Sequence, residues 1–326
     1  MPKKMPQGRT GAPYPRLLGD VGGTEHRYGW MASPGAAIAQ VVSVPGSGDL
    51  GAEIKGYLSD QELAAPASAS LGIAAPVFGD VVTMTNGDAR FSIRELEREL
   101  GVDTLLVIND FAALAHALRS LLDDESWRVG GGDAAAGGAL ALVGPGTGLG
   151  VSGLLAVPGG HAPVVGEGGH ATLAAENDRE AEVLAVLRRR FGHVSAERVL
   201  SGPGIANLHA ALCRLSGSPT EELAPAEITQ RALDGSDDCC REALDLFFAF
   251  LGSVAGDVAL TLGARGGVYI GGGIVARLGA AIDRSRFRER FEAKGRYRPY
   301  LAGIPTRVLV DSSSLALRGA NAALEI

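Results

Sequence analysis

Short apolar runs that end in glycine turns occur twice along the chain. Leu17 to Thr24 reads LLGDVGGT, and a second apolar segment follows at Arg27–Met31. A strand, a tight turn and a returning strand explain this pattern, because glycine accepts the backbone angles that such turns need. Ala139 to Gly148 reads ALALVGPGTG and leads into Leu149–Val157, which repeats the arrangement. We therefore expect two related α/β halves that face a cleft.

The length of each remaining apolar segment indicates whether it forms a strand or a helix. Short runs are expected as strands: Val41–Val44, Ala69–Ala75, Val81–Thr85, Thr104–Ile108, Gly267–Ile270 and Arg307–Val310. Longer segments are expected as helices: Phe111–Leu122, Asn177–Arg190, Ile205–Leu215, Glu227–Leu233, Asp237–Leu262, the glycine turn and helix Gly271–Ile282, and a closing helix from about Ser314. Ser92 and Glu95 form a capping box for one more helix, which ends before Gly101.

The segment Asp123–Gly138 is polar and rich in glycine and alanine, so we place a lobe boundary there. We expect a flexible tail over residues 1–15, a small α/β lobe over residues 16–122 with 311–326, and a large α/β lobe over residues 123–310. The closing helix is expected to pack back onto the first lobe.

Composition narrows the class of protein. The 326 residues are 46% hydrophobic, which suffices for a buried core and excludes a disordered chain. The net charge of -7 argues against nucleic-acid binding, and we expect the basic runs Arg188–Arg190 and Arg286–Arg298 to be solvated helix faces. No apolar run approaches the roughly 20 residues that a membrane span needs. We therefore expect no membrane contact. The chain has three cysteines, Cys213, Cys239 and Cys240, which cannot form a disulfide framework, so we expect a cytoplasmic protein.

Three glycine turns are candidates for holding phosphate. The first follows Asp20, whose carboxylate suits Mg²⁺ held through water. The turn residues are Gly22, Gly23 and Thr24, then Gly146, Thr147 and Gly148, and finally Gly271, Gly272 and Gly273, which could pass under a base and ribose. An ordinary hairpin, or close packing of a helix on a strand, explains each turn equally well when it is considered alone.

Other nucleotide and hydrolase motifs do not fit. The chain has no GxxxxGK[ST] sequence, which excludes a Walker-type nucleotide-binding loop. Leu149 interrupts a GxGxxG pattern, and a strand follows where a dinucleotide site needs a helix. Gly150–Leu154 lacks the last glycine of a nucleophile elbow.

Asp110 is the strongest candidate for a catalytic residue. It follows a predicted strand, at the position where ligands usually bind in an open α/β sheet. A carboxylate there could orient a sugar hydroxyl and take its proton late in phosphoryl transfer, with Asn109 bonded to a neighbouring hydroxyl. Asp is also a favoured helix N-cap, and a helix is expected to begin directly after Asp110, so both roles stay open.

A second polar group lies in the predicted large lobe. Glu167 and His170 stand in a glycine-flanked loop, and acceptor groups of this kind suit a polyol. A zinc site there is the rival, but the other histidines and the cysteines do not stand at ligand spacing. Glu197 lies in the first turn of an expected helix, where the helix dipole already favours a carboxylate. Taken alone, Glu197 would be called structural.

The motifs GDVGGT, INDFAALA, GPGTGLGV, GEGGH, GHVSAERVLSGPGIANL and GGVYIGGGI together resemble the bacterial glucokinases of the hexokinase and actin-like ATPase superfamily. The resemblance covers about Leu17 to Val310. It implies a two-lobed α/β fold with a ribonuclease-H-like core in each lobe and a cleft between them. It also implies ATP-dependent phosphorylation of the 6-hydroxyl of glucose, the first step of glycolysis, and a homodimer.

The resemblance assigns roles to the candidates. Asp110 matches the catalytic base, and Asn109, Glu167, His170 and Glu197 match the sugar contacts. Asp20 matches the magnesium-linked acid, residues 22–24 and 146–148 the phosphate loops, and residues 271–273 the adenosine motif. Glu25 departs from the family pattern and adds a carboxylate beside a phosphate loop, which opposes ATP unless the side chain points away or helps to hold Mg²⁺. A kinase for another hexose and a catalytically weakened sugar-sensing regulator are the alternatives.

Overall fold

The computed structural model describes residues 11–23, 25–84, 90–158, 160–219 and 221–325. Thr24 and the first ten residues of the expected tail lie outside this part of the chain. The chain divides into unit 1, Met1–Leu121 with Ser313–Ile326, and unit 2, Leu122–Ser312. Each unit has its own central sheet.

The sheet of unit 1 has the strand order β3-β2-β1-β4-β7. Its strands are β1 (Arg16–Val21), β2 (Glu25–Met31), β3 (Ala39–Pro45), β4 (Ser68–Ile73) and β7 (Thr104–Asn109), and a separate small sheet pairs β5 (Val81–Thr83) with β6 (Arg90–Ser92). The strands β1, β2 and β3 form an antiparallel meander, whereas β4 lies parallel to both β1 and β7. The hairpin expected after Leu17 is therefore present.

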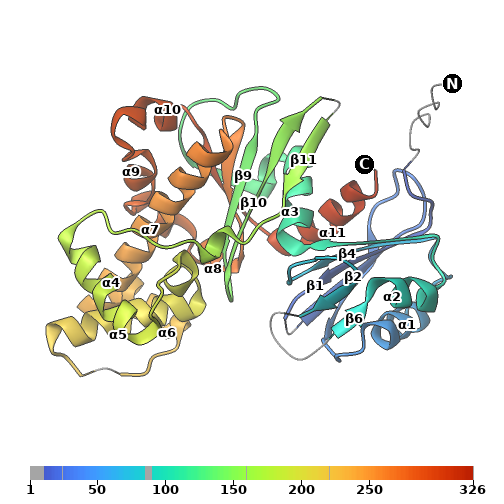
Figure 1. The fold of residues 1–326 in the computed structure, drawn as a ribbon, viewed down its shortest axis with the longest axis horizontal. Helices are drawn as coiled ribbons and strands as arrows, with labels where there is room; N and C mark the ends of the chain where they lie inside the picture. Colours follow the sequence, from blue (N-terminus) through green and yellow to red (C-terminus); the bar gives the residue numbers. More distant parts are fainter. Residues whose placement is uncertain (1–10, 24, 85–89, 159, 220, 326) are drawn as a thin grey trace. The chain divides into compact units, whose positions relative to one another are not determined.

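The α-helices of the described part of unit 1 are α1 (Leu50–Asp60), α2 (Ile93–Leu100), α3 (Asp110–Ala117) and α11 (Ser312–Ala323) (Figure 1). Ser92 is the N-cap of α2, as the expected capping box requires, since its hydroxyl accepts the Glu95 N–H at 3.2 Å. The closing helix packs on unit 1 as expected, because Leu317 shares a buried cluster with Leu18 and Met31. Helix α1 was not expected from the sequence pattern.

The sheet of unit 2 has the order β11-β10-β9-β12-β13-β8. Its strands are β8 (Ser126–Gly130), β9 (Leu140–Pro145), β10 (Leu149–Val157), β11 (Gly160–Val164), β12 (Gly267–Ile270) and β13 (Thr306–Leu309). Leaving β8 aside, the order and directions match those of unit 1, which confirms the internal repeat. The segment 123–138 is not wholly a linker, because β8 lies within it and pairs antiparallel with β13.

Helices α4 to α7 pack against one another in unit 2 (Figure 1). The helices of this unit are α4 (Asp178–Phe191), α5 (Gly202–Ser216), α6 (Pro225–Asp234), α7 (Asp238–Leu262), α8 (Gly273–Leu278), α9 (Phe287–Glu292) and α10 (Arg298–Ala302). Short 3-10 turns stand at Asp123–Glu125, Gly168–His170, Ala196–Arg198, Gly279–Arg284 and Gly295–Tyr297, and unit 1 has one at Leu118–Ser120.

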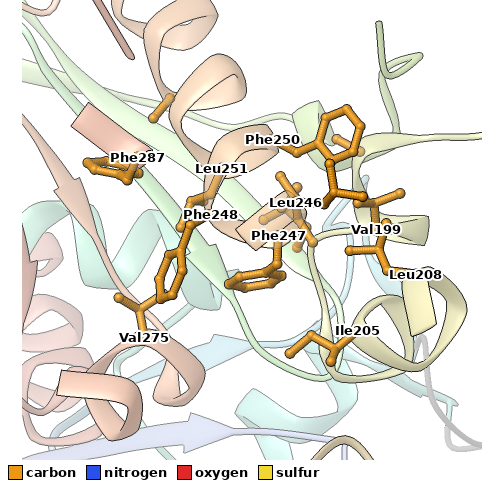
Figure 2. Close-up of a cluster of buried hydrophobic side chains, with 14 of the residues drawn as sticks. Val199, Ile205, Leu208, Leu246, Phe247, Phe248, Phe250, Leu251, Val275 and Phe287 are labelled. Atoms are coloured by element: carbon orange, nitrogen blue, oxygen red, sulfur yellow. The ribbon is translucent and has the colours of Figure 1, made fainter. Parts of the chain in front are cut away.

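Helix α7 is the centre of the core in unit 2. Its residues Phe247, Phe248 and Leu251 are buried in one cluster with Ile205 of α5 and Phe287 of α9 (Figure 2). The helix is long and apolar enough to cross a membrane by length and composition, but 72% of that apolar window is buried within the structure. We therefore interpret α7 as a core helix.

The expectation that Arg286–Arg298 is a solvated face is wrong for Arg290. Its side chain is buried and pairs with the buried Glu180 of α4, with one Nη2–Oε2 distance of 3.2 Å. Burial by itself raises the pKa of Glu180, but hydrogen bonds and the charge of Arg290 outweigh it and hold that pKa below its usual value. This ion pair joins α9 to α4 across the core.

Helix α3 lies unusually close to α11 within unit 1. A β-carbon built on Gly319 of α11 would stand 1.8 Å from the carbonyl oxygen of Ala113 in α3. No side chain fits at that separation, so glycine allows the two helix backbones to touch. Because α3 begins at Asp110, this contact also positions the strongest catalytic candidate.

Gly319→Ala is expected to lower the free energy of unfolding by about 1–3 kcal/mol, because α11 must move away from α3. Gly56→Ala is the matched control. Gly56 lies inside α1 with open space around it, so alanine there should be neutral or raise stability by up to about 1 kcal/mol. Urea unfolding of both variants checks this, and equal effects would contradict the close contact.

Arg290→Met should destabilise the protein by about 3–5 kcal/mol at neutral pH, because it leaves Glu180 as an unpaired buried charge. Since the folded-state pKa of Glu180 is lowered, the pairing contributes fully above the ordinary pKa of 4.5 and is lost as the pH falls below it. The difference between wild type and variant should therefore shrink below that pH. Arg286→Met, which removes an exposed ion pair with Glu289, is the control and should cost at most about 1 kcal/mol.

Candidate active site

The carboxyl ends of three parallel strands bring the candidates of unit 1 to one edge of its sheet. Asp20 of β1 is in register with Gly72 of β4, which is in register with Ile108 of β7. Asp20 and the Asn109–Asp110 pair therefore lie on the same edge, two strands or roughly 10 Å apart. Ligands usually bind at this edge of an open α/β sheet.

The N-terminus of α3 fixes Asn109 and Asp110. Asn109 is the N-cap, and its Oδ1 accepts the N–H groups of Phe111 and Ala112 at 3.0 and 3.2 Å. The alternative that Asp110 caps this helix is therefore wrong. Asp110 is instead the first helical residue, half-buried, and its Oδ1 accepts the Phe111 N–H at 2.8 Å. The helix dipole favours a carboxylate in this first turn.

The turn between β1 and β2 is closed by its backbone. The Gly22 N–H donates to the carbonyl of Glu25 at 3.1 Å, and the Glu25 side chain is exposed. The next residue, His26, contacts helix α1, because its Nδ1 lies 2.6 Å from the Glu53 carboxylate. Tyr28 donates to the same Glu53 oxygen at 2.5 Å. His26, Tyr28 and Glu53 thus form a buried polar group that gives the His26 side chain of β2 a hydrogen-bond partner. Sequence reasoning did not predict that Glu53 contacts β2.

In unit 2, the turn between β9 and β10 is fixed by Glu197. Its Oε2 accepts the Leu149 N–H at 2.9 Å, directly after the turn residues Gly146, Thr147 and Gly148. The N–H of Gly202, at the start of α5, donates to the carbonyl of Gly146 at 2.8 Å. The expected helix around Glu197 is a 3-10 turn, Ala196–Arg198. Glu197 is therefore more than a helix-terminal carboxylate, since it shapes the glycine turn.

Glu167, His170 and Glu197 form one polar cluster on unit 2. His170 Nδ1 lies 3.8 Å from Glu197 Oε1, and His170 Nε2 lies 4.0 Å from Glu167 Oε2. The loop that carries Glu167 and His170 ends in a 3-10 turn, which packs on β10. The three side chains are 50%, 57% and 31% exposed, so their oxygen and nitrogen atoms can reach the hydroxyl groups of a ligand.

The Gly271–Gly273 turn lies beside the β9–β10 turn, because β12 and β9 are parallel neighbours. Gly272 has a φ of +77°, and a β-carbon there would stand 2.3 Å from the carbonyl oxygen of Pro145. Glycine is therefore required by the close approach of the two turns. The Gly272 N–H donates to the Ser312 hydroxyl at 3.0 Å. Sequence reasoning gave Ser312 no role, and only the fold reveals this contact.

Each unit thus contributes one group of candidates. Unit 1 brings together Asp20, Gly22, Gly23, Asn109 and Asp110 at one sheet edge. Unit 2 brings together both glycine turns and the cluster of Glu167, His170 and Glu197. Backbone turns of this kind can bind phosphate oxygens, and paired carboxylates with an imidazole can bind a polyol.

Comparison with known proteins agrees with this chemistry. The glucokinase family model matches residues 17–326. The chain is 53% identical over 315 residues to a glucokinase of Aromatoleum aromaticum, covering 96% of this chain and 95% of that protein. It is 50% identical over 319 residues to a glucokinase of Chromobacterium violaceum, with 97% and 91% covered. A solved glucokinase from an Antarctic psychrotroph is 36% identical, with a TM-score of 0.86 and 95% and 98% of the chains covered.

These similarities extend over nearly the whole chain and agree with the order of the sheets in both units. The expected fold class, a two-lobed α/β protein of the actin-like ATPase type, is confirmed by the match in structure. The resemblance drawn from the sequence motifs is confirmed by the family match. The chain belongs to the glucokinase family.

Proposed function

We propose that this chain transfers the γ-phosphoryl group of ATP to the 6-hydroxyl of D-glucose, giving glucose 6-phosphate and ADP as the first step of glycolysis. Family membership supports the reaction class. The observation that carries the proposal is the bond from the Leu149 N–H to Glu197, which joins the polar cluster to a glycine turn. Groups suited to hydroxyls and to phosphate are thereby held by one residue.

Asp110 is the catalytic base in this proposal. Its position in the first turn of α3 suits a carboxylate, because the helix dipole favours a negative charge there. The carboxylate orients the 6-hydroxyl and accepts its proton as the bond to phosphorus forms. Asn109 contributes through its amide Nδ2, because its Oδ1 already caps the helix.

Glu167, His170 and Glu197 bind the remaining sugar hydroxyls in this proposal. Each carboxylate can accept two hydrogen bonds, and the imidazole can donate or accept one at each nitrogen. Such a set fixes the orientation of a sugar ring, which brings the 6-hydroxyl into position for transfer.

The glycine turns bind ATP in this proposal. Gly22, Gly23 and Thr24 bind phosphate oxygens, Gly146, Thr147 and Gly148 do the same, and Gly271, Gly272 and Gly273 bind the adenosine. Asp20 fits an Mg²⁺ ion held through water, because it is a half-buried carboxylate at the end of β1 beside a backbone turn. A bound Mg²⁺ ion supplies neutralisation of phosphate charge. The exposed Glu25 side chain can point into solvent and so leaves this turn usable.

A homodimer and a cytoplasmic location belong to the same proposal. The family resemblance supports the dimer, and sedimentation equilibrium of the purified chain measures it. The three cysteines, Cys213, Cys239 and Cys240, are all free thiols, which suits a reducing compartment.

Asp110→Asn is expected to lower kcat by about 10²–10⁴-fold, because the amide cannot accept the hydroxyl proton. Glucose binding should change little, since Asn keeps the shape and one acceptor oxygen. Steady-state kinetics and calorimetric glucose binding check this. Asp103→Asn, on an exposed acid just before β7, should match wild type. A fall in affinity as large as the fall in kcat would contradict the role as base.

Glu197→Ala and Glu197→Gln are expected to differ. Alanine removes both the sugar contact and the acceptor for Leu149, so the KM values for glucose and for ATP should both rise at least about tenfold. Glutamine keeps an acceptor for Leu149 and should raise mainly the KM for glucose. Glu222→Ala, at an exposed site, is the control. Equal effects of the two variants on the KM for ATP would contradict the link between Glu197 and the turn.

A further inference from the structure

A second group of chemically reactive side chains lies between α5 and α7 in unit 2. His209 and Cys213 stand four residues apart on one face of α5. Asp237 is the N-cap of α7, and Cys240 lies in the first turn of that helix. Sequence reasoning ranked a zinc site low because the histidines and cysteines do not stand at ligand spacing along the chain. The packing of α5 on α7 brings these four residues together.

The donor atoms of this group have the spacing of a metal site. One ligand atom each from His209, Asp237 and Cys240 lies within 4.8 Å of the other two. His209 Nε2 lies 3.4 Å from Cys213 Sγ. Zn–N and Zn–S bonds of about 2.0 and 2.3 Å with tetrahedral angles place neighbouring N and S ligands about 3.5 Å apart. The His209–Cys213 pair has this separation, but Cys213 is a neighbour of the group and not one of the three residues whose donor atoms all lie within 4.8 Å of one another.

Burial and access also suit a bound ion. His209, Cys213 and Cys240 are all at most 3% exposed, whereas Asp237 is partly exposed. A cavity of about 680 Å³ beside them is lined by His209, Cys213 and Asp237, which gives an ion a path to the donors. A thiolate and imidazole set with one carboxylate is typical of zinc rather than of magnesium.

Asp237 caps helix α7, and this role is compatible with metal binding. Its Oδ1 accepts the Cys240 N–H at 2.9 Å and so caps α7. A carboxylate has two oxygens and about four acceptor positions, so capping leaves capacity for a cation. Helix capping alone would not require a buried histidine and two buried thiols around the cap.

We propose that His209, Asp237 and Cys240 bind one Zn²⁺ ion, which joins α5 to α7. The role of the ion is structural, because its three protein ligands come from α5 and from the start of α7, which the ion holds together. Binding stabilises the folded state, since an unfolded chain does not hold the three donors together. The inference is independent of the proposed reaction.

Cobalt substitution tests the site directly. The purified full chain is freed of metal with a chelator, kept reduced with a phosphine, and titrated with Co²⁺ and then Zn²⁺. We expect one Co²⁺ per chain with the absorption of tetrahedral thiolate coordination, displacement by Zn²⁺, and a higher melting temperature with either ion. The absence of this absorption at stoichiometric Co²⁺, with no change in melting temperature, would overturn the proposal.

Substitutions test the ligand set. Asp237→Asn keeps a capping side chain but removes the carboxylate, and Cys240→Ser removes one thiolate. Each should weaken Co²⁺ binding at least about tenfold, because even the loss of an outer partner of a ligand costs 10–100-fold. Cys239→Ser is the matched control, since Cys239 lines the same cavity but is not in the ligand set. Loss of binding in Cys239→Ser, or unchanged binding in Asp237→Asn, would contradict the assignment.

Discussion

Parallel pairing of strands is the constraint on which the candidate site depends. In each unit, the strand that opens an antiparallel meander also pairs in parallel with a later strand. Parallel strands end at the same edge of the sheet, so residues far apart in the sequence meet there. Asp20 thereby shares an edge with Asp110, and the Gly146–Gly148 turn adjoins Gly271–Gly273. The repeat of one topology in both units explains why both carry a glycine turn after the first strand of the meander, which is β1 in unit 1 and β9 in unit 2.

A few side chains that bond to backbone then fix the conformation at these edges. Asn109 caps α3 and so fixes the backbone of Asp110, the first residue of that helix. Glu197 accepts the N–H that follows the β9–β10 turn, and Ser312 accepts the N–H of Gly272. Such bonds order the loops before any ligand binds, which lowers the entropic cost of binding. Within the helices of unit 2, the buried ion pair of Arg290 and Glu180 fixes α9 against α4.

Features with a local signal were predictable from the sequence, and features that depend on distant partners were not. The glycine hairpins, the N-cap at Ser92 and the long apolar helix at Asp238–Leu262 follow from neighbouring residues. Helix α1 was missed because it contains two glycines, Gly51 and Gly56, and β8 because it is a short edge strand beside a glycine-rich segment. The sequence also could not tell whether Asn109 or Asp110 caps α3, because both residue types are favoured at the N-cap. Glu180, which pairs with Arg290, and Cys240, which lies near His209, are on other helices, and no sequence spacing signals such contacts.

The central claim is that the chain phosphorylates glucose with ATP. The most direct measurement is ADP release by the purified protein with MgATP, with no sugar, with glucose, and with mannose, fructose or N-acetylglucosamine at matched concentrations. The account predicts release that requires a sugar and is fastest with glucose. Preference for another hexose would contradict the proposed substrate. The absence of release with every sugar, while glucose still raises the melting temperature, would contradict the kinase activity and indicate a sugar-binding protein.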